Sequence, residues 1–195
     1  MPRRPVEPAR PAALPLRGRA NVVHAVNAQL RSGQSVLLVG PEAVGKSAIA
    51  TAVARPDVLL LDPLQKIGRQ LARTLRYRLD SGHVAVATAR TRPPGRIAGV
   101  GRILWRFRTI HVPPVPAAVI RQIIRDTFRH EGPGGAELPE SWWRDAIAAA
   151  NGRPGYAVAI ARDTARTLAK SGLWRAPKLI VIDYRITLVT RAREP

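Results

Sequence analysis

Cysteine is absent from this 195-residue sequence, and so are long apolar runs. Without cysteine the chain has no disulfide, no thiolate metal site and no cysteine nucleophile, and it suits a reducing compartment. No apolar run approaches the ~18 residues that a membrane-spanning helix needs, and the first residues lack the apolar stretch of a signal peptide. We therefore expect a soluble, cytoplasmic protein without a membrane partner.

Acidic residues are scarce. The chain has 13 Asp and Glu against 32 Lys and Arg, which gives a formal net charge of +19. A surplus of this size favours a polyanionic partner, because each phosphate that a cation neutralises releases counterions. Aromatic residues make up only 5% of the chain, which argues against the stacking of single-stranded bases. Double-stranded DNA is therefore the expected partner.

A glycine-rich segment stands between an apolar run and an alanine-rich run. Residues 40–47, GPEAVGKS, fit the pattern G-x-x-x-x-G-K-[ST] at each fixed position. Two glycines let the backbone turn tightly and approach an anion, while the loop N–H groups and the following helix attract phosphate. We expect this segment to bind a nucleoside triphosphate, with the phosphates contacting residues Gly40, Pro41, Glu42, Ala43, Val44, Gly45, Lys46, Ser47 and Ala48. Lys46 would neutralise the β- and γ-phosphates, and the Ser47 hydroxyl would bind Mg²⁺.

Short apolar runs around this segment predict an α/β fold with buried parallel strands at residues 35–39, 58–61, 84–88 and 109–112. Two of these runs end in a polar side chain, Asp62 and Thr88. Apolar spacing predicts helices at residues 22–31 and 64–80, and a short helix at 97–105. In the helix 64–80 we expect a buried stripe of Leu64, Ile67, Leu71, Leu75 and Leu79.

The second half of the chain is predominantly helical. Spacing predicts helices at residues 117–130, 140–150 and 154–169, which would form a small lid. Residues 179–189 are rich in β-branched side chains and alternate from Asp183 onward, so they predict a strand. That strand would either offer a docking edge or pair within its own chain. Residues 1–16 hold five prolines and three arginines and predict a flexible arm. Such an arm could touch nucleic acid or a neighbouring subunit, or be an ordinary disordered terminus.

The order of these features resembles the AAA+ ATPases. A Gly-Arg box, the phosphate loop, a strand ending in Asp, a strand ending in Thr, an Arg-Phe pair and a helical lid follow one another over residues 17–170. Within these ATPases the order is most similar to the branch of the origin-recognition initiators and the transposition regulators of the TniB, TnsC and MuB kind. The resemblance implies ATP and Mg²⁺ as cofactors, and a homo-oligomer with ATP at its subunit interfaces.

The resemblance also assigns roles to single residues. It implies that Arg17, Gly18 and Arg19 lie near the adenine, and that Asp62 joins Ser47 around Mg²⁺. Thr88 matches the sensor-1 position. Arg106, before Phe107, matches the arginine that reaches the γ-phosphate held by the adjacent subunit, and Arg153 lies near the sensor-2 position.

The sequence departs from the family pattern in two places. Only about 15 residues separate Ser47 from Asp62, where the family fits a further strand and helix, so a reduced sheet is expected. Pro63 follows Asp62 where the family has the acid that polarises the attacking water. Because that water-positioning group is missing, we expect slow hydrolysis of ATP or none.

Positive charge is concentrated in the middle of the chain. Residues 63–125 contain thirteen Lys and Arg and one acid, Asp80. In the predicted helix, Arg69, Arg73 and Arg76 share one face through their i, i+4, i+7 spacing. Arg90, Arg92 and Arg96 follow in a loop rich in Pro and Gly. These six arginines could bind the phosphates of a duplex without reading its sequence. Alternatively, they form an ordinary solvated face.

Two functions are consistent with these features. The first is an ATP-dependent, sequence-tolerant DNA-binding protein that forms a ring or filament and recruits a partner such as a transposase. The second is a nucleotide-gated regulatory ATPase of the STAND type with a protein partner, which the segment 152–155, GRPG, also fits. In both, residues 1–16 form an arm, 17–115 a nucleotide-binding core, 116–170 a lid and 171–195 a strand-like extension.

Overall fold

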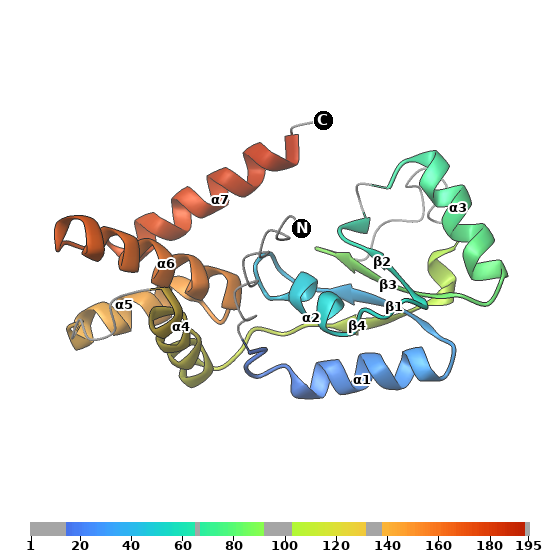
Figure 1. Cartoon of the computed structure of the whole chain (residues 1–195), viewed down its shortest axis with the longest axis horizontal. Helices are drawn as coiled ribbons and strands as arrows, with labels where there is room; N and C mark the ends of the chain where they lie inside the picture. The colour runs from blue at the N-terminus through green and yellow to red at the C-terminus, as the bar shows by residue number, and fades with distance from the viewer. Residues whose placement is uncertain (1–14, 65–66, 92–102, 132–137, 194–195) are drawn as a thin grey trace, which may run out of the picture.

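The chain folds into an α/β core and a helical lobe that lie side by side (Figure 1). A computed structural model describes residues 15–64, 67–91, 103–131 and 138–193. Most of the predicted arm, most of the predicted helix 97–105, and both Arg92 and Arg96 lie outside these residues. No helix in the described ranges is long and apolar enough to cross a membrane.

The core is a four-stranded parallel sheet with helices on both faces. Its strands are β1 (Ser35–Val39), β2 (Val58–Leu61), β3 (Val84–Ala89) and β4 (Phe107–His111), and their order is β2-β3-β1-β4. The helices are α1 (Ala20–Arg31), α2 (Lys46–Ala52) and α3 (Arg69–Asp80). The α/β fold with a reduced parallel sheet is thus confirmed, because only the short helix α2 joins the phosphate loop to β2, with no further strand between them.

Alternation along the strands divides the core into two apolar layers. On one face Val36 and Leu38 of β1 pack with α1 and α2 residues such as Val26 and Ile49. On the other face Leu37 packs with residues of α3. Since both faces of β1 are buried, the sheet holds the phosphate loop at the end of a rigid central strand.

Helix α3 differs from its prediction. It begins at Arg69, so Leu64 and Ile67 are buried in the segment before the helix and not on its stripe. Leu71 is 49% exposed, and Ala72 is buried in its place. Ala72, Leu75 and Leu79, at positions i, i+3 and i+7, form the face that meets the sheet. Since a helix has 3.6 residues per turn, Leu71 lies at the border of this face.

The helical lobe contains α4 (Ala117–Glu131), α5 (Glu140–Ala150), α6 (Pro154–Ser171) and α7 (Pro177–Arg193). Its core gathers residues such as Ile120, Trp142, Tyr156 and Ile160 from α4, α5 and α6. The strand predicted for residues 179–189 is wrong, because this segment belongs to helix α7. Ile180 and Val181 are buried in the lobe and Tyr184 packs edge-on against Tyr156. Burial of this i, i+1, i+4 face outweighs the weak preference of β-branched residues for strands.

Candidate nucleotide site

The phosphate loop joins β1 to α2, and its two glycines are fixed by close packing and by backbone conformation. A Cβ on Gly40 would lie 2.7 Å from the carbonyl oxygen of Val112, which follows β4. Gly45 adopts φ 99°, a left-handed conformation that favours glycine. Both glycines of the sequence pattern are therefore required by the fold, and they leave the loop backbone open to an anion.

Lys46 is half-buried inside the loop. Its Nζ donates hydrogen bonds to the carbonyls of Gly40 at 2.8 Å and Pro41 at 2.7 Å. Burial lowers the pKa of Lys46; nearby Asp62 opposes this effect, Arg90 adds to it, and Glu42 opposes it. The ammonium group thus lies among two carboxylates and a guanidinium.

Asp62 and Thr88 meet at the carboxyl edge of the sheet. Their strands β2 and β3 are neighbours, and Leu61 pairs with Ala87. Asp62 and Thr88 are the next residues in sequence after this pair and therefore lie side by side. Thr88 Oγ1 donates a hydrogen bond to Asp62 Oδ1. Ser47 follows Lys46 at the start of α2 on the same edge. In the described ranges no group of three His, Cys, Asp or Glu side chains could hold a metal ion. A hydroxyl, one carboxylate and phosphate oxygens are nevertheless a donor set that suits Mg²⁺.

The Gly-Arg box ties the core to the helical lobe. The Arg17 Nε donates to Asp126 Oδ2 of α4 at 2.8 Å. Arg19 is only 2% exposed. Its Nη1 donates to the Pro113 carbonyl at 2.7 Å and its Nη2 donates to the Val44 carbonyl at 2.6 Å. Burial lowers the pKa of Arg19. This one guanidinium therefore joins the phosphate loop to the segment that leads into the lobe.

Gly18, between these two arginines, has φ 66°, and a Cβ there would lie 3.1 Å from Val119 Cγ1. Glycine at this position lets the chain pass close to α4.

Helix α6 begins directly against the phosphate loop. The Gly155 N–H donates to the Ala43 carbonyl at 2.8 Å, and a Cβ on Gly155 would lie 3.0 Å from Ala43 Cβ. The Gly152 carbonyl accepts a hydrogen bond of 2.8 Å from the Val115 N–H. Arg153 lies between them, with its guanidinium 5.3 Å from the Tyr156 ring centroid. A shift of the lobe must therefore disturb the loop.

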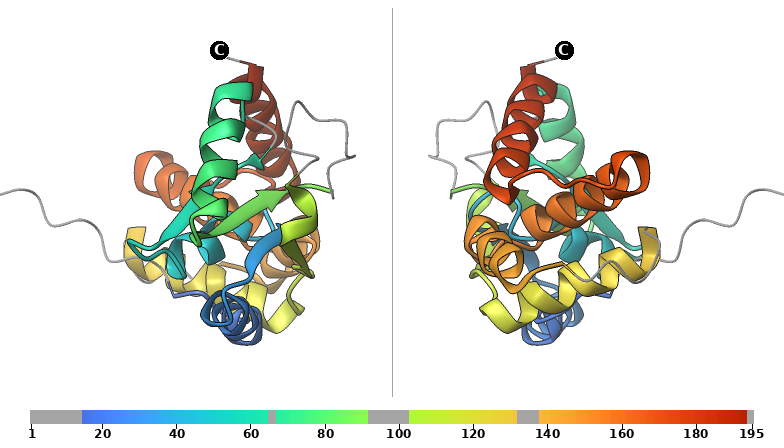
Figure 2. Two further views of the ribbon diagram at one scale, coloured as in Figure 1. Left: turned by 90° about the vertical axis from the view of Figure 1, so that its right-hand side faces the viewer. Right: turned by 90° about the vertical axis from the view of Figure 1, so that its left-hand side faces the viewer.

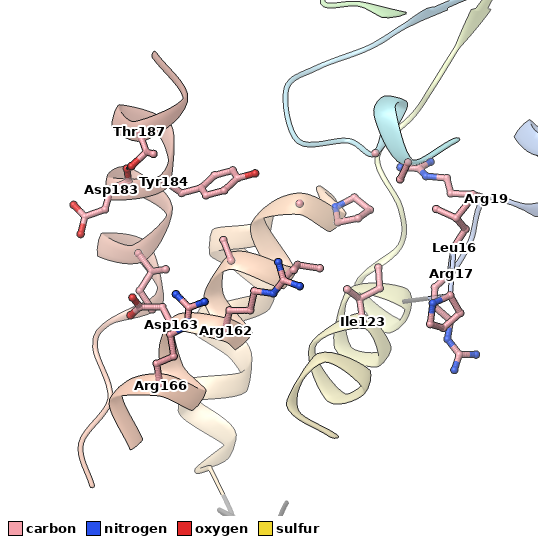
Figure 3. A pocket seen from close by; sticks show the side chains of 18 of the residues that line it. Leu16, Arg17, Arg19, Ile123, Arg162, Asp163, Arg166, Asp183, Tyr184 and Thr187 are labelled. Carbon is pink, nitrogen blue, oxygen red and sulfur yellow. The ribbon is translucent and has the colours of Figure 1, made fainter. Parts of the chain in front are cut away.

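A cavity of about 650 Å³ opens between the phosphate loop and the lobe (Figure 3). Its wall is mixed. It includes the apolar residues Leu16, Ile123 and Val158, and it is charged both at the Gly-Arg box, beside the loop, and farther out along α6 and α7. The sequence did not indicate that residues of α6 and α7 line this cavity. They are Val158, Ala159, Arg162, Asp163, Arg166, Ile180, Asp183, Tyr184 and Thr187. The α6 residues of the cavity recur at helical spacing after Gly155, so the sequence pattern could have predicted them. The α7 residues could not be predicted, because their segment was expected to form a strand.

Arg106 lies at the edge of the sheet opposite the phosphate loop. It precedes β4, where Phe107 is level with Ser35 at the start of β1. Five strand residues, about 16 Å, separate these two edges. Arg106 Nη2 is 2.6 Å from Asp80 Oδ1. Its guanidinium lies 5.2 Å from the ring centroid of Trp105, which is 74% exposed. Arg106 therefore cannot reach the phosphate loop of its own chain.

Three of the four arginines of α3 are the predicted DNA-binding residues Arg69, Arg73 and Arg76. They are exposed at the end of the molecule opposite the lobe, where α3 stands in front in the left-hand view of Figure 2. Arg76 is paired with Asp80 at 3.8 Å. No ion pair joins Arg69 or Arg73 to a residue of the described ranges. Arg90, which follows β3, pairs with Glu42 of the phosphate loop at 3.1 Å. Of the predicted DNA-binding arginines that the structure describes, three form an exposed row on α3 and the fourth, Arg90, lies beside the phosphate loop.

No family model matches the sequence, and no curated protein matches it either. Solved structures do match the fold. Domain III of the replication initiation protein DnaA from Thermotoga maritima superposes with a TM-score of 0.61 at 12% identity, over 85% of this chain and 90% of that one.

Two further solved structures superpose with a TM-score of 0.55. The RuvB Holliday junction branch migration motor of the same organism matches at 16% identity, over 86% of this chain and 68% of that one. A katanin structure matches at 15% identity, over 80% of this chain and 71% of that one. All three neighbours are AAA+ ATPases. The chain therefore has the fold of the AAA+ ATPases.

Proposed function

We propose that this protein is an ATP-dependent, sequence-tolerant DNA-binding protein that oligomerises on a duplex and recruits a partner such as a transposase, with slow ATP hydrolysis or none. The observation that carries the nucleotide part is the phosphate loop, which contacts the helical lobe through Arg19 and Gly155. A ligand in the loop would therefore change how the lobe sits. ATP then acts as a switch ligand more than as a fuel.

The nucleotide would lie with its base in the apolar part of the cavity, beside the Gly-Arg box and Ile123, and with its phosphates in the loop. Lys46 would exchange the carbonyls of Gly40 and Pro41 for phosphate oxygens. Ser47 and Asp62 would hold Mg²⁺, and Thr88 would keep the Asp62 carboxylate oriented. Bound Mg²⁺ supplies charge neutralisation for the phosphates. Arg153, now stacked on Tyr156, is the lobe residue that would sense the nucleotide.

Oligomerisation would use the opposite edge of the sheet. Arg106 cannot reach its own phosphate loop, and it would bind ATP held by the loop of an adjacent subunit, with exposed Trp105 beside it. The neighbouring structures are consistent with this proposal: one concerns katanin self-assembly, one is a Holliday junction branch migration motor and one is a domain of a replication initiation protein.

DNA would lie along α3. The side chains of Arg69 and Arg73 are exposed and carry no intramolecular ion pair within the described ranges, so their charges are available to phosphates. Together with Arg76 and Arg90 they offer positive charge without a recognition element for bases. Arg92 and Arg96, which follow Arg90 in sequence, would extend this surface.

A second function is favoured by one observation. The segment Gly152–Gly155 packs on the phosphate loop, and the same sequence pattern occurs in the nucleotide-gated STAND ATPases. In that function the partner is a protein and the positive charge is incidental.

A filter-binding assay with plain duplex DNA, with and without ATP, separates the two functions. We expect retention of several unrelated duplexes that requires ATP and that falls with added salt. Absence of DNA retention together with tight ATP binding would favour the regulatory ATPase.

A further inference from the structure

Glu42 is the second residue after Gly40, in the middle of the phosphate loop. One of its carboxylate oxygens, Oε2, lies 3.1 Å from Arg90 Nη2. The other, Oε1, is buried and has no hydrogen-bond partner among the described residues. A buried carboxylate oxygen without a partner is costly unless a ligand or water binds to it. This oxygen therefore has an unused acceptor capacity within the nucleotide site.

The surroundings of Glu42 are fixed by the same contacts that build the loop. The Pro41 carbonyl, just before Glu42, accepts from Lys46 Nζ at 2.7 Å, and the Ala43 carbonyl, just after it, accepts from Gly155 at 2.8 Å. Arg90 follows Ala89, whose carbonyl accepts from the Gly40 N–H at 3.4 Å. The carboxylate is thus held between the loop and the end of β3, on a rigid backbone.

The end of β2 provides no second acid next to Asp62. Pro63 occupies the place after Asp62 where an acid is expected, and Asp62 is bonded to Thr88. Glu42 is the further carboxylate that acts electrostatically on Lys46. A general base must reach the water that attacks the γ-phosphorus, and a loop that encloses the phosphates brings its own side chains close to that water.

We propose that Glu42 is the general base of a slow ATP hydrolysis, and that Arg90 positions it. This inference rests on the proposed nucleotide site. In the reaction, a water bound to Oε1 gives one proton to the Glu42 carboxylate as its oxygen bonds to the γ-phosphorus. The bond from that phosphorus to the β–γ bridging oxygen breaks with both electrons on the bridging oxygen. The products are ADP and inorganic phosphate, and Glu42 then returns the proton to solvent.

The same carboxylate has a second effect on binding. The negative charge of Glu42 within the phosphate loop repels ATP. Removal of this charge should therefore tighten ATP binding and, because the base is lost, slow ATP turnover. These two changes have opposite signs. Damage to the loop or loss of a purely structural ion pair would weaken binding and slow turnover together.

The test compares Glu42→Gln with Glu140→Gln in the full chain. Glu140 is a matched control, because it also pairs with an arginine, Arg121, at 2.6 Å, but on the helical lobe away from the loop. ATP affinity is measured by titration, and single-turnover conversion of bound ATP to ADP is followed by chromatography. For Glu42→Gln we expect conversion to fall by about 100-fold or more, the range for loss of a general base, with ATP affinity equal or tighter. Glu140→Gln should match the wild type in both.

Four outcomes are decisive. Unchanged conversion in Glu42→Gln, or no conversion in the wild type despite ATP binding, would overturn the role of Glu42 while leaving the proposed function intact. Weaker ATP binding in Glu42→Gln would assign the residue to loop structure alone. Failure of the wild type to bind ATP would overturn both proposals. Arg90→Gln should slow conversion less than Glu42→Gln, because it frees the base without removing it.

Discussion

Replacement of Arg19 by methionine tests how the core is joined to the helical lobe. Methionine keeps most of the apolar length of the side chain but removes both donors, so the carbonyls of Pro113 and Val44 lose their partners. Hydrogen bonds from a charged group contribute about 1.5–3 kcal/mol each, and unpaired buried carbonyls add a penalty of similar size. The desolvation of the guanidinium, which also lowers its pKa, offsets part of this stabilisation.

The net loss for Arg19→Met should be about 3 kcal/mol, a large share of the ~5–15 kcal/mol stability of an ordinary domain. Arg19→Lys keeps the charge but can reach one carbonyl well, so about half of this loss is expected. Urea unfolding followed by circular dichroism gives both values. Because Val44 belongs to the phosphate loop, both variants should also bind ATP more weakly in a titration.

Arg31→Met provides the control, because Arg31 is exposed at the other end of α1. Arg31→Met should change the free energy of unfolding by less than about 0.5 kcal/mol, as for most surface positions. If Arg19→Met unfolds at the same urea concentration as the wild type and binds ATP normally, Arg19 does not join the core to the helical lobe.

The remaining predictions concern nucleotide and assembly. Lys46→Ala should reduce ATP affinity at least tenfold, about 1.4 kcal/mol, in a direct titration, because it removes the cation in the loop; unchanged affinity would contradict the phosphate-loop assignment. Steady-state phosphate release should stay well below ~1 per second even with DNA, since Pro63 replaces an acid, and brisk turnover would contradict this reasoning. Arg106→Ala should still bind ATP but lose ATP-dependent oligomers in sedimentation, whereas Arg108→Ala, two residues on, should keep them; normal oligomers of Arg106→Ala would refute its role.

The α/β core could be predicted from sequence because each signal in it is local. The phosphate-loop pattern specifies its own glycines, and short apolar runs specify buried strands. Residues Asp62 and Thr88 could be placed at strand ends, and the parallel sheet then brought them together. The sequence also indicated a reduced sheet, since too few residues separate Ser47 from Asp62 for another strand and helix.

Features that depend on tertiary contacts could not be predicted in the same way. Helix α7 is rich in Ile, Val and Thr, and its conformation is decided by burial of Ile180 and Val181 against the lobe. The pairing of Arg106 with Asp80 depends on the register of β4 and the end of α3. The two bonds of Arg19 join carbonyls 25 and 94 residues away, and no local pattern encodes such distances.

We propose that the arginine row on α3 binds duplex DNA under the control of ATP. This role of α3 is tested most directly by the salt dependence of duplex binding in saturating ATP for the triple variant Arg69→Glu, Arg73→Glu, Arg76→Glu. A control that reverses the exposed cations Arg144, Lys170 and Lys178 of the lobe changes the net charge equally. We expect the wild type and the control to lose affinity with salt, with a slope of about −0.9 per phosphate neutralised. The α3 variant should bind ATP normally and show no duplex binding. Salt-sensitive duplex binding by the α3 variant at the level of the control would contradict the account.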